Sequence, residues 1–430
     1  MKQIKSDISG FYKIPIAKRQ ALISESCNLS LEEKDLLNNL GYFKVDQLDT
    51  MIENVIGSYQ LPLGIATNFK VNNKDYLIPM VIEEPSVVAA ASNAAKMTRN
   101  RGGFTSDNIK SLMISQIQTS QLTDIKQAQA KLEKSKDTLI NIANEQDPML
   151  VKLGGGAVNI EWRLLKTRRG SMIILHLIVD VLDAMGANIV NTMAEAISPY
   201  IEEITGGNVS LRIVSNLATY RIARSKAIFD KDMLGGIEVV EAILDAYEFA
   251  REDPYRATTH NKGVMNGIIA LTLATGNDTR AIEAGAHSYA AISGKYTPLT
   301  HFTKDKNGNL IGSIELPLAM GIIGGMTKVH PMARLALKIL NVTSANELGQ
   351  VAAALGLAQN VAALRALVSE GIQKGHMRLH SRNIAKLAGV PEEYLETVAD
   401  RIVKDKKIRV DHAKNVLDEI LKVKSTKMDE

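Results

Sequence analysis

The alternation of apolar and polar positions is clearest between residues 110 and 219. Four segments of this stretch are strand-like, at residues 112–117, 161–166, 171–182 and 209–214. An Arg-Arg-Gly-Ser sequence at residues 168–171 predicts a hairpin turn between two of these strands. Apolar residues also recur at helical spacing, at Ile189, Met193, Ile197, Ile201 and Ile204. We therefore predict one antiparallel sheet backed by helices.

The sequence before this stretch predicts a capped helix, a hairpin and a second helix. The Ser30-Leu31-Glu32-Glu33 sequence is typical of a capped helix start. Residues 71–75, with two asparagines in a row, predict a hairpin turn. Pro85 then opens an alanine-rich helix over residues 87–96.

After residue 220 the chain is rich in Ala, Gly and Leu, and the pattern becomes helical. Helices are predicted at residues 239–249, 332–340 and 345–355, with glycine-rich turns between them. Charge density rises beyond His380, and the Pro391-Glu392-Glu393 sequence predicts the start of a charged helical tail that reaches Glu430.

Composition excludes several classes of protein. With 430 residues, 45% of them hydrophobic and 23% charged, the chain has room for two or three folded domains. A net charge of +4 is too small to indicate a nucleic-acid partner. The single cysteine, Cys27, excludes an internal disulfide and a multi-cysteine metal site. The strongest apolar run, residues 172–179, is too short to span a membrane, so we expect a cytoplasmic protein.

Two ionisable residues lie in contexts where burial could make them reactive. Glu84 comes just before the proline that starts a helix, so either a reactive carboxylate or a helix-capping role is expected there. Lys262 lies in DPYRATTHNKGVMNG, which we interpret as a polar segment between apolar helices. A desolvated ammonium can stabilise a developing oxyanion, whereas a solvated surface lysine cannot do so well.

Two more ionisable residues have equally open interpretations. Asp278 follows a Gly-Asn turn at the head of a helix, so taken alone it indicates an N-cap rather than a catalyst. His376 follows Gly375, and His380 lies one helical turn later. This HxxxH pair lacks the glutamate of HExxH and has no further ligand cluster, so we expect no metal. A general acid on a mobile segment fits His376 better.

The nucleotide-binding signal is indirect. No GxGxxG sequence follows a strand, so a Rossmann fold is not supported. The DAMGAN sequence at residues 183–188 instead joins a strand to the head of a helix. Small residues at a helix N-terminus can hold a pyrophosphate, although many ordinary strand-to-helix turns look similar.

Taken together, eight ordered motifs resemble those of the class II 3-hydroxy-3-methylglutaryl-coenzyme A (HMG-CoA) reductases. They are ENVIG at 53–57, EEPSVVAAAS at 83–92, GGG at 154–156, DAMGAN at 183–188, DPYRATTHNKG at 253–263, ATGND at 274–278, GLAQN at 356–360 and GHMRLH at 375–380. The resemblance covers nearly the whole chain. It implies reduction of the HMG-CoA thioester by two NAD(P)H, through mevaldehyde, to mevalonate and coenzyme A, or the reverse oxidation.

The resemblance also implies a role for each reactive residue. Glu84 would be the acidic proton donor, Lys262 would bind the thioester oxygen, and Asp278 would organise both by hydrogen bonding. His376 would protonate the departing coenzyme A thiolate. The implied substrate contacts are Ser86, Arg256, Asn266 and Gln359. Arg256 is suited to a bidentate grip on the free carboxylate.

For the fold, the resemblance implies an α+β protein of three parts. A large, helix-rich α+β domain over residues 1–109 and 220–374 would bind substrate and dimerise. A small α+β domain over residues 110–219, with a non-Rossmann antiparallel sheet, would bind the cofactor. Residues 375–430 would form a helical C-terminal flap. The expected assembly is a homodimer with shared active sites, or a higher oligomer of such dimers.

Cofactor choice depends on Asp147, which aligns with an acidic position that NADH-preferring members of the family carry near the adenosine ribose. A carboxylate there repels a 2′-phosphate, so NADH is favoured and NADPH is the alternative. Lys152, Arg168 and Arg169 weigh against this preference, and an Asp before Pro148 is often a turn residue. The remaining cofactor contacts implied are Asp183, Met185, Asn188 and Asn216.

Some observations leave alternatives open. Asn159 and Thr279 depart from the residues that some family members carry, which affects only fine contacts. A different acyl-coenzyme A or aldehyde dehydrogenase would need a cysteine nucleophile, for which Cys27 is the only choice. A catalytically silent homologue is disfavoured because all four reactive residues are present. The direction of the reaction, mevalonate synthesis or degradation, stays open.

Overall fold

The computed structural model describes residues 13–41, 43–107, 110–369 and 381–426, which fall into two compact units, Met1–Pro62 and Leu63–Glu430. The first unit contains α1 (Ile16–Ser26), α2 (Leu31–Asn38) and α3 (Val45–Asp49) around a small core of Ile16, Leu48 and Val55. Ser30 and Glu33 form a capping box, with each side chain accepting the other residue's backbone N–H. The predicted helix start at Ser30 is therefore confirmed.

A six-stranded sheet lies at the centre of the second unit. Its strands, in spatial order, are β2 (Lys74–Val81), β1 (Leu63–Val71), β3 (Phe104–Ser106), β8 (Ile222–Phe229), β10 (Leu310–Pro317) and β9 (Thr300–Lys304). All neighbours pair antiparallel except β1 and β3. Asn72 and Asn73 turn the β1–β2 hairpin with positive φ angles of 49° and 68°, as its sequence predicts.

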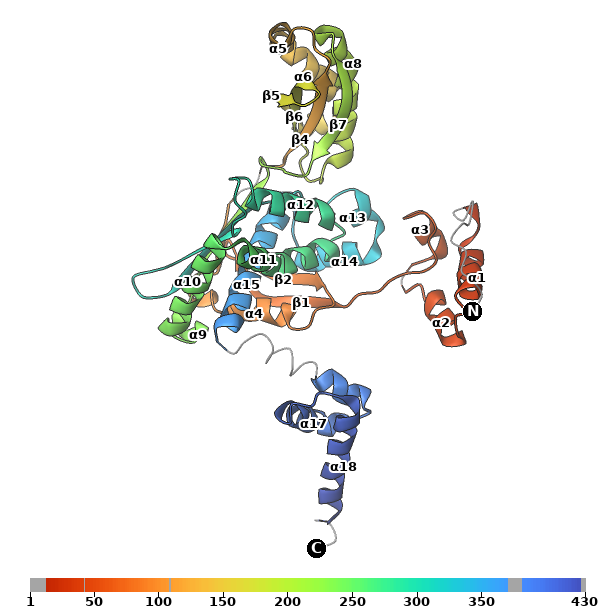
Figure 1. Cartoon of the computed structure of the whole chain (residues 1–430), viewed down its shortest axis with the longest axis vertical. Coiled ribbons are helices and arrows are strands. Elements are labelled where there is room, and N and C mark those ends of the chain that lie inside the picture. The colour runs from red at the N-terminus through yellow and green to blue at the C-terminus, as the bar shows by residue number, and fades with distance from the viewer. Residues whose placement is uncertain (1–12, 42, 108–109, 370–380, 427–430) are drawn as a thin grey trace. The chain divides into compact units, whose positions relative to one another are not determined.

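The helices around this sheet are α4 (Val87–Lys96), η2 (Arg99–Arg101), α9 (Lys231–Leu234), α10 (Ile237–Glu252), α11 (Pro254–Ala274), α12 (Thr279–Ala290), α13 (Gly325–Val329), α14 (Pro331–Leu340) and α15 (Ala345–Val368). In Figure 1, α15 runs through the middle of this unit beside α11 and α4. Among the described residues, α15 is the one helix long and apolar enough to cross a membrane, but most of it is buried, as in a core helix.

Two helix predictions need correction. The helix predicted at residues 345–355 continues to Val368, and the segment around Lys262 is not a polar stretch between helices but the interior of α11. Asp253 caps α11 and Pro254 occupies its first turn. Gly263 and Gly267 face α15: a Cβ on Gly267 would lie 3.1 Å from that of Gln359. These glycines allow close helix packing and do not end the helix.

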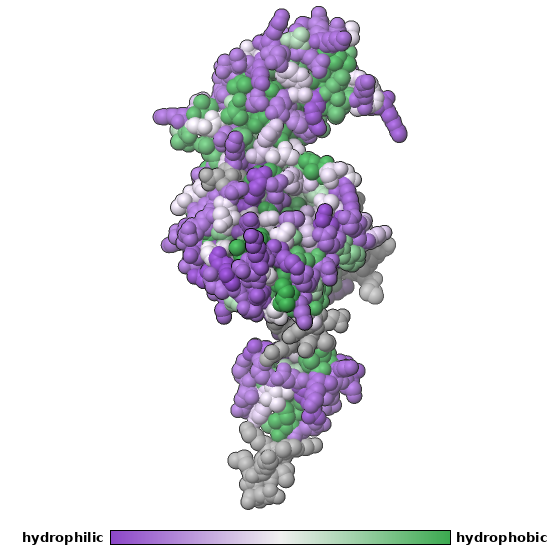
Figure 2. Space-filling model, turned by 90° about the vertical axis from the view of Figure 1, so that its left-hand side faces the viewer, coloured by the Kyte–Doolittle hydropathy of each residue, from purple (hydrophilic) through white to green (hydrophobic). Residues whose placement is uncertain are grey.

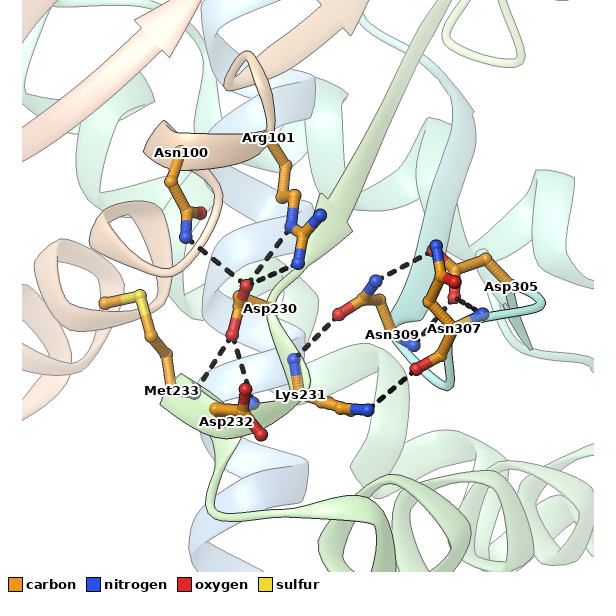
Figure 3. A network of polar contacts seen from close by, with 9 residues as sticks. All are labelled: Asn100, Arg101, Asp230, Lys231, Asp232, Met233, Asp305, Asn307 and Asn309. Atoms are coloured by element: carbon orange, nitrogen blue, oxygen red, sulfur yellow. Dashed lines mark hydrogen bonds and ion pairs between the residues drawn. The ribbon is translucent and has the colours of Figure 1, made fainter.

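A polar network ties the end of β8 to its surroundings (Figure 3). The buried carboxylate of Asp230 accepts hydrogen bonds from Arg101 and Asn100, and it caps α9 through two backbone N–H groups. Lys231 reaches the carbonyl of Asn307 in the β9–β10 turn. Because these contacts join β8 to η2, α9 and the β9–β10 turn, we assign the network a structural role.

The second sheet has four antiparallel strands in the order β5 (Gly156–Thr167), β6 (Gly170–Asp180), β4 (Leu112–Ser120), β7 (Asn208–Ser215). Its helices are α5 (Ile125–Lys134), α6 (Lys136–Asn144), α7 (Pro148–Lys152) and α8 (Ala187–Thr205). A hydrophobic core lies between α5, α6, α8 and one face of the sheet (Figure 1). The predicted antiparallel sheet backed by helices, its β5–β6 hairpin and the α8 helix are confirmed.

The C-terminal residues form helices at 381–387, α17 (Glu392–Lys404) and α18 (Val410–Thr426), which pack around their own small core. The predicted helix start after Pro391 is confirmed. The face drawn in Figure 2 is largely hydrophilic, with apolar residues in small groups, as expected when most apolar side chains lie in these cores. The fold is thus α+β, as predicted.

Candidate active site

A cavity of about 370 Å³ lies between the start of α4, α11 and α15. Glu84 and Ser86 line it from the β2–α4 connection. Helical spacing places Arg256, Thr259, His260, Gly263 and Asn266 on the face of α11 that lines it. Gln359 and Asn360 contribute from α15. Segments up to about 275 residues apart in the sequence therefore meet in one polar cavity.

An ion pair occupies its mouth. The Nζ atom of Lys262 lies 2.8 Å from Oε2 of Glu84, and the Asn266 amide nitrogen lies 3.5 Å from the same oxygen. The Lys262 side chain is 59% exposed and that of Glu84 33%. The expectation that Lys262 is desolvated is therefore not met by the described part of the chain, which leaves the ammonium largely exposed. Its strongest electrostatic effect requires water to be excluded.

Glu84 does not cap the following helix. Ser86 occupies the N-cap position of α4, with a left-handed backbone (φ 73°) and no side-chain cap hydrogen bond. A left-handed serine is strained, and such strain persists mainly where the surrounding structure holds a side chain for function. The Ser86 hydroxyl is thus not used for capping and faces the cavity region.

Arg256 is a partly buried cation without a carboxylate partner among the described residues. Its backbone N–H donates to Asp253 at the start of α11, and desolvation lowers the pKa of its guanidinium. A cation that has lost water without gaining an anion is a favourable site for one. This is the environment expected of a residue that grips a free carboxylate.

The wall of the cavity is buried and polar. The Nε2 atom of His260 lies 2.6 Å from Oγ1 of Thr300, which lies 2.9 Å from Oδ1 of Asn360. Within the described part of the chain, Nδ1 of His260 and Oε1 of Gln359 have no hydrogen-bond partner. Burial, with the nearby charge of Arg256, lowers the pKa of His260 to about 3, so its ring is neutral.

Asp278, a further predicted catalytic residue, does not line this cavity in one chain. Asp278 caps α12, accepting backbone hydrogen bonds from Arg280 and Ala281, and it does not line the cavity. The N-cap interpretation of Asp278 is therefore confirmed. A catalytic role would require that something other than the fold of one chain bring its carboxylate to the cavity. His376 lies outside the described residues.

The predicted dinucleotide turn joins β6 to α8. Gly186 is the N-cap with φ 99°, and a Cβ there would lie 2.6 Å from the Val181 side chain, so only glycine fits. No side chain caps α8, which leaves its first N–H groups available for a pyrophosphate. The donor set and the small residues fit a nicotinamide dinucleotide. Asp183 holds this turn to the start of α15 by accepting the Ala345 N–H at 2.7 Å.

Arg221 is a residue that we did not identify from the sequence. Its guanidinium is 1% exposed and donates to the carbonyls of Ala184 and Met185 in the dinucleotide turn, and to that of Met320. Desolvation lowers its pKa to about 10. A single arginine just before a strand gives no sequence signal that three backbone carbonyls will lie around it.

The remaining cofactor predictions fall on partly exposed positions. Asp147 caps α7 by accepting the Leu150 N–H at 2.9 Å, which is the turn role considered for an Asp before proline. Asn188 lies in the first turn of α8, and Asn216 is exposed just after β7. Among the residues that the structure describes, no group of three or more His, Cys, Asp or Glu could hold a metal ion.

Comparisons with known proteins agree with this picture. The family model described as hydroxymethylglutaryl-coenzyme A reductase matches residues 15–381. The 3-hydroxy-3-methylglutaryl-coenzyme A reductase of Archaeoglobus fulgidus is 59% identical over 97% of this chain and 96% of its own length. The probable 3-hydroxy-3-methylglutaryl-coenzyme A reductase of Borreliella burgdorferi is 38% identical over 87% of this chain and 86% of its own length. The class II enzyme of Streptococcus pneumoniae, solved with NADPH in open conformations, aligns with a TM-score of 0.75 at 39% identity, covering 94% of this chain and 99% of that one.

Proposed function

This chain belongs to the hydroxymethylglutaryl-coenzyme A reductase family, and we propose that the cavity between α4, α11 and α15 is its substrate site. Its activity is the reduction of HMG-CoA to mevalonate in the isoprenoid pathway. The observation that supports this site best is the Lys262–Glu84 ion pair beside the unpaired guanidinium of Arg256. These groups match the two polar ends of a hydroxymethylglutaryl thioester.

Lys262 binds the thioester oxygen in this proposal. Reduction places negative charge on that oxygen, and an ammonium within hydrogen-bonding distance stabilises it. Glu84, whose carboxyl oxygen lies 2.8 Å from the ammonium and 3.5 Å from the Asn266 amide nitrogen, donates a proton to the same oxygen once it has itself been protonated. The pair thus acts as one unit that supplies charge and a proton at a single position.

Arg256 receives the free carboxylate of the hydroxymethylglutaryl group. Ser86 and Gln359 line the same cavity and complete the polar contacts. Because the carboxylate would offset the desolvation that lowers the Arg256 pKa, binding is favourable even though both groups lose water.

A reduced nicotinamide dinucleotide supplies the hydride. We place it at the β6–α8 turn, with the α8 N-terminus toward its pyrophosphate and contacts from Asp183, Met185, Asn188 and Asn216. The Streptococcus pneumoniae relative was solved with NADPH. For this chain we propose NADH, because Asp147 would repel a 2′-phosphate, with NADPH as the alternative.

We further propose a homodimer, or an oligomer of such dimers, in which the partner subunit supplies Asp278 to the Lys262–Glu84 pair. The exposure of Lys262 and the distance of Asp278 from the cavity in one chain are the observations that support it. The other expectations also remain proposals, namely a flap over residues 375–430, with His376 protonating the coenzyme A thiolate, and a cytoplasmic location. Oxidation of mevalonate is the alternative direction.

The test is oxidation of NADH or NADPH by purified protein, which should depend on HMG-CoA. Replacing Arg256 by Lys keeps the charge but removes the bidentate grip, so KM for HMG-CoA should rise about 10- to 100-fold with a smaller change in kcat. If the KM of Arg256→Lys for HMG-CoA equalled that of the wild type, the assignment of Arg256 to the substrate's free carboxylate would be contradicted.

A further inference from the structure

The hydrogen bonds around His260 determine which of its nitrogens carries the proton. The Asn360 amide nitrogen donates to the His260 carbonyl at 3.0 Å, so its oxygen is the atom facing Thr300. The Thr300 hydroxyl has one hydrogen, and it donates that hydrogen to Asn360. His260 must therefore donate from Nε2 to the Thr300 oxygen, which leaves Nδ1 as a bare acceptor.

This acceptor is buried without a partner in the described part of the chain. His260 is 1% exposed, and its ring cannot gain a proton readily, because burial and the charge of Arg256 both favour the neutral form. The Gln359 amide oxygen, 4% exposed and lining the same cavity, also lacks a donor. Unpaired buried acceptors destabilise a fold, and native structures rarely retain them without a ligand or a function.

The substrate has one group that fits such an acceptor. Its carboxylate and thioester oxygens can only accept hydrogen bonds, and they are matched by Arg256 and Lys262. The tertiary 3-hydroxyl is the single donor of the hydroxymethylglutaryl group. A cavity lined by two cations, and by two residues whose buried acceptors lack a donor, is complementary to an acceptor-rich molecule with one hydroxyl.

We propose that Nδ1 of His260, held as an acceptor by Thr300 and Asn360, receives the hydrogen bond of the substrate's tertiary hydroxyl and so selects hydroxylated over deoxy acyl groups. This inference rests on the cavity being the substrate site. A site built to hydrogen-bond a hydroxyl rejects the analogue that lacks it, because its buried acceptor then stays unpaired.

The experiment compares two thioesters, HMG-CoA and the analogue that lacks only the 3-hydroxyl, in wild type, His260→Gln and His260→Asn. Glutamine reaches the Nε2 position and can keep the Thr300 contact, but it places no acceptor at Nδ1. Asparagine places its amide oxygen near Nδ1 and loses Thr300. For His260→Gln we expect kcat/KM with HMG-CoA to fall about 10- to 100-fold, with the deoxy analogue changed by less than about twofold. His260→Asn should keep a preference for HMG-CoA.

Two controls keep the result interpretable. His287, whose Nδ1 lies 2.7 Å from the Tyr296 hydroxyl away from the cavity, provides the matched variant His287→Gln, which should behave as wild type. Thermal unfolding of each variant reports folding. Equal losses with both thioesters in His260→Gln, or loss of preference only in His260→Asn, would overturn the proposal. If Arg256→Lys left KM for HMG-CoA unchanged, the substrate-site assignment itself would fail, which is a different result.

Discussion

At the scale of single residues, the reactive groups could be predicted from the sequence but their environments could not. Glu84, Lys262 and Arg256 stand in recognisable motifs, and the structure brings them to one cavity. The exposure of Lys262 could not be predicted, because it depends on what covers α11 in space. The tautomer of His260 could not be predicted either, since it is set by Thr300 and Asn360, which lie 40 and 100 positions away in the sequence.

Asp147 allows a residue-scale prediction about cofactor choice. One of its carboxylate oxygens already caps α7, so Asp147→Ala should cost some local stability as well as remove the charge. If this carboxylate repels a 2′-phosphate, wild type should have a higher kcat/KM with NADH than with NADPH. Asp147→Ala should shift that ratio toward NADPH by about tenfold. Asp147→Asn, which can keep the cap without the charge, is the control.

Measuring kcat/KM with each cofactor for the three proteins decides the question. A wild type that prefers NADPH, or a ratio unchanged in Asp147→Ala, would show that another group discriminates between the cofactors. A shift in Asp147→Ala that is absent from Asp147→Asn would assign the effect to the cap and not to the charge.

At the scale of elements, hydrophobic periodicity predicted the second sheet and α8 well, because each strand there buries one face. It failed for α11, whose polar residues line the cavity and whose glycines face α15. A helix that has polar residues on the face lining the cavity and small residues on the face packed against α15 shows no clear apolar stripe in its sequence. The error therefore fell on the segment that carries the site, where local patterns are expected to fail.

The contact between α15 and the β1–β2 hairpin gives a prediction about stability and pH. Glu347, in the first turn of α15, accepts hydrogen bonds from Lys74 and Tyr76, both at 2.6 Å, and from Thr343. Burial opposes its ionisation, but these donors outweigh burial and lower its pKa from 4.5 to about 2. A lowered carboxyl pKa stabilises the fold above the unfolded-state value, and this stability is lost as the pH falls from about 4.5 toward 2.

Replacing Glu347 by Gln should therefore lower the free energy of unfolding by roughly 2 kcal/mol at neutral pH and flatten its dependence between about pH 4.5 and 2. Denaturant unfolding of both proteins across this range measures the effect. Glu252→Gln, which removes the exposed pair with Lys295, is the control and should change little. If the free energy of unfolding depended on pH in the same way for wild type and Glu347→Gln, the stabilising role of the Glu347 carboxylate would be contradicted.

At the scale of the whole molecule, the site of one chain is incomplete if Asp278 is catalytic. Asp278 caps α12 and does not line the cavity that holds Lys262. Patterns along one chain cannot show which residues a second copy contributes, so the sequence could indicate Asp278 only through its motif. A two-fold dimer would place the Asp278 of each subunit at the other's cavity.

Complementation tests this arrangement. Lys262→Ala and Asp278→Ala chains should each be inactive alone. When the two variants are refolded together in equal amounts, about half of the dimers contain one chain of each. Each mixed dimer has one site, out of two, with both native residues. The activity of the mixture should therefore recover to about a quarter of that of the wild type. If Asp278 acted within its own chain, no site would be complete and the mixture would stay inactive.

HMG-CoA-dependent oxidation of NADH or NADPH by Lys262→Ala measures whether the Lys262–Glu84 pair assists the reduction of HMG-CoA. Removing an ammonium that stabilises the oxyanion should lower kcat about 100- to 1000-fold or more, while thermal unfolding stays near that of wild type because the side chain is 59% exposed. Turnover within a few fold of wild type in a folded Lys262→Ala protein would contradict the assignment of this cavity as the active site.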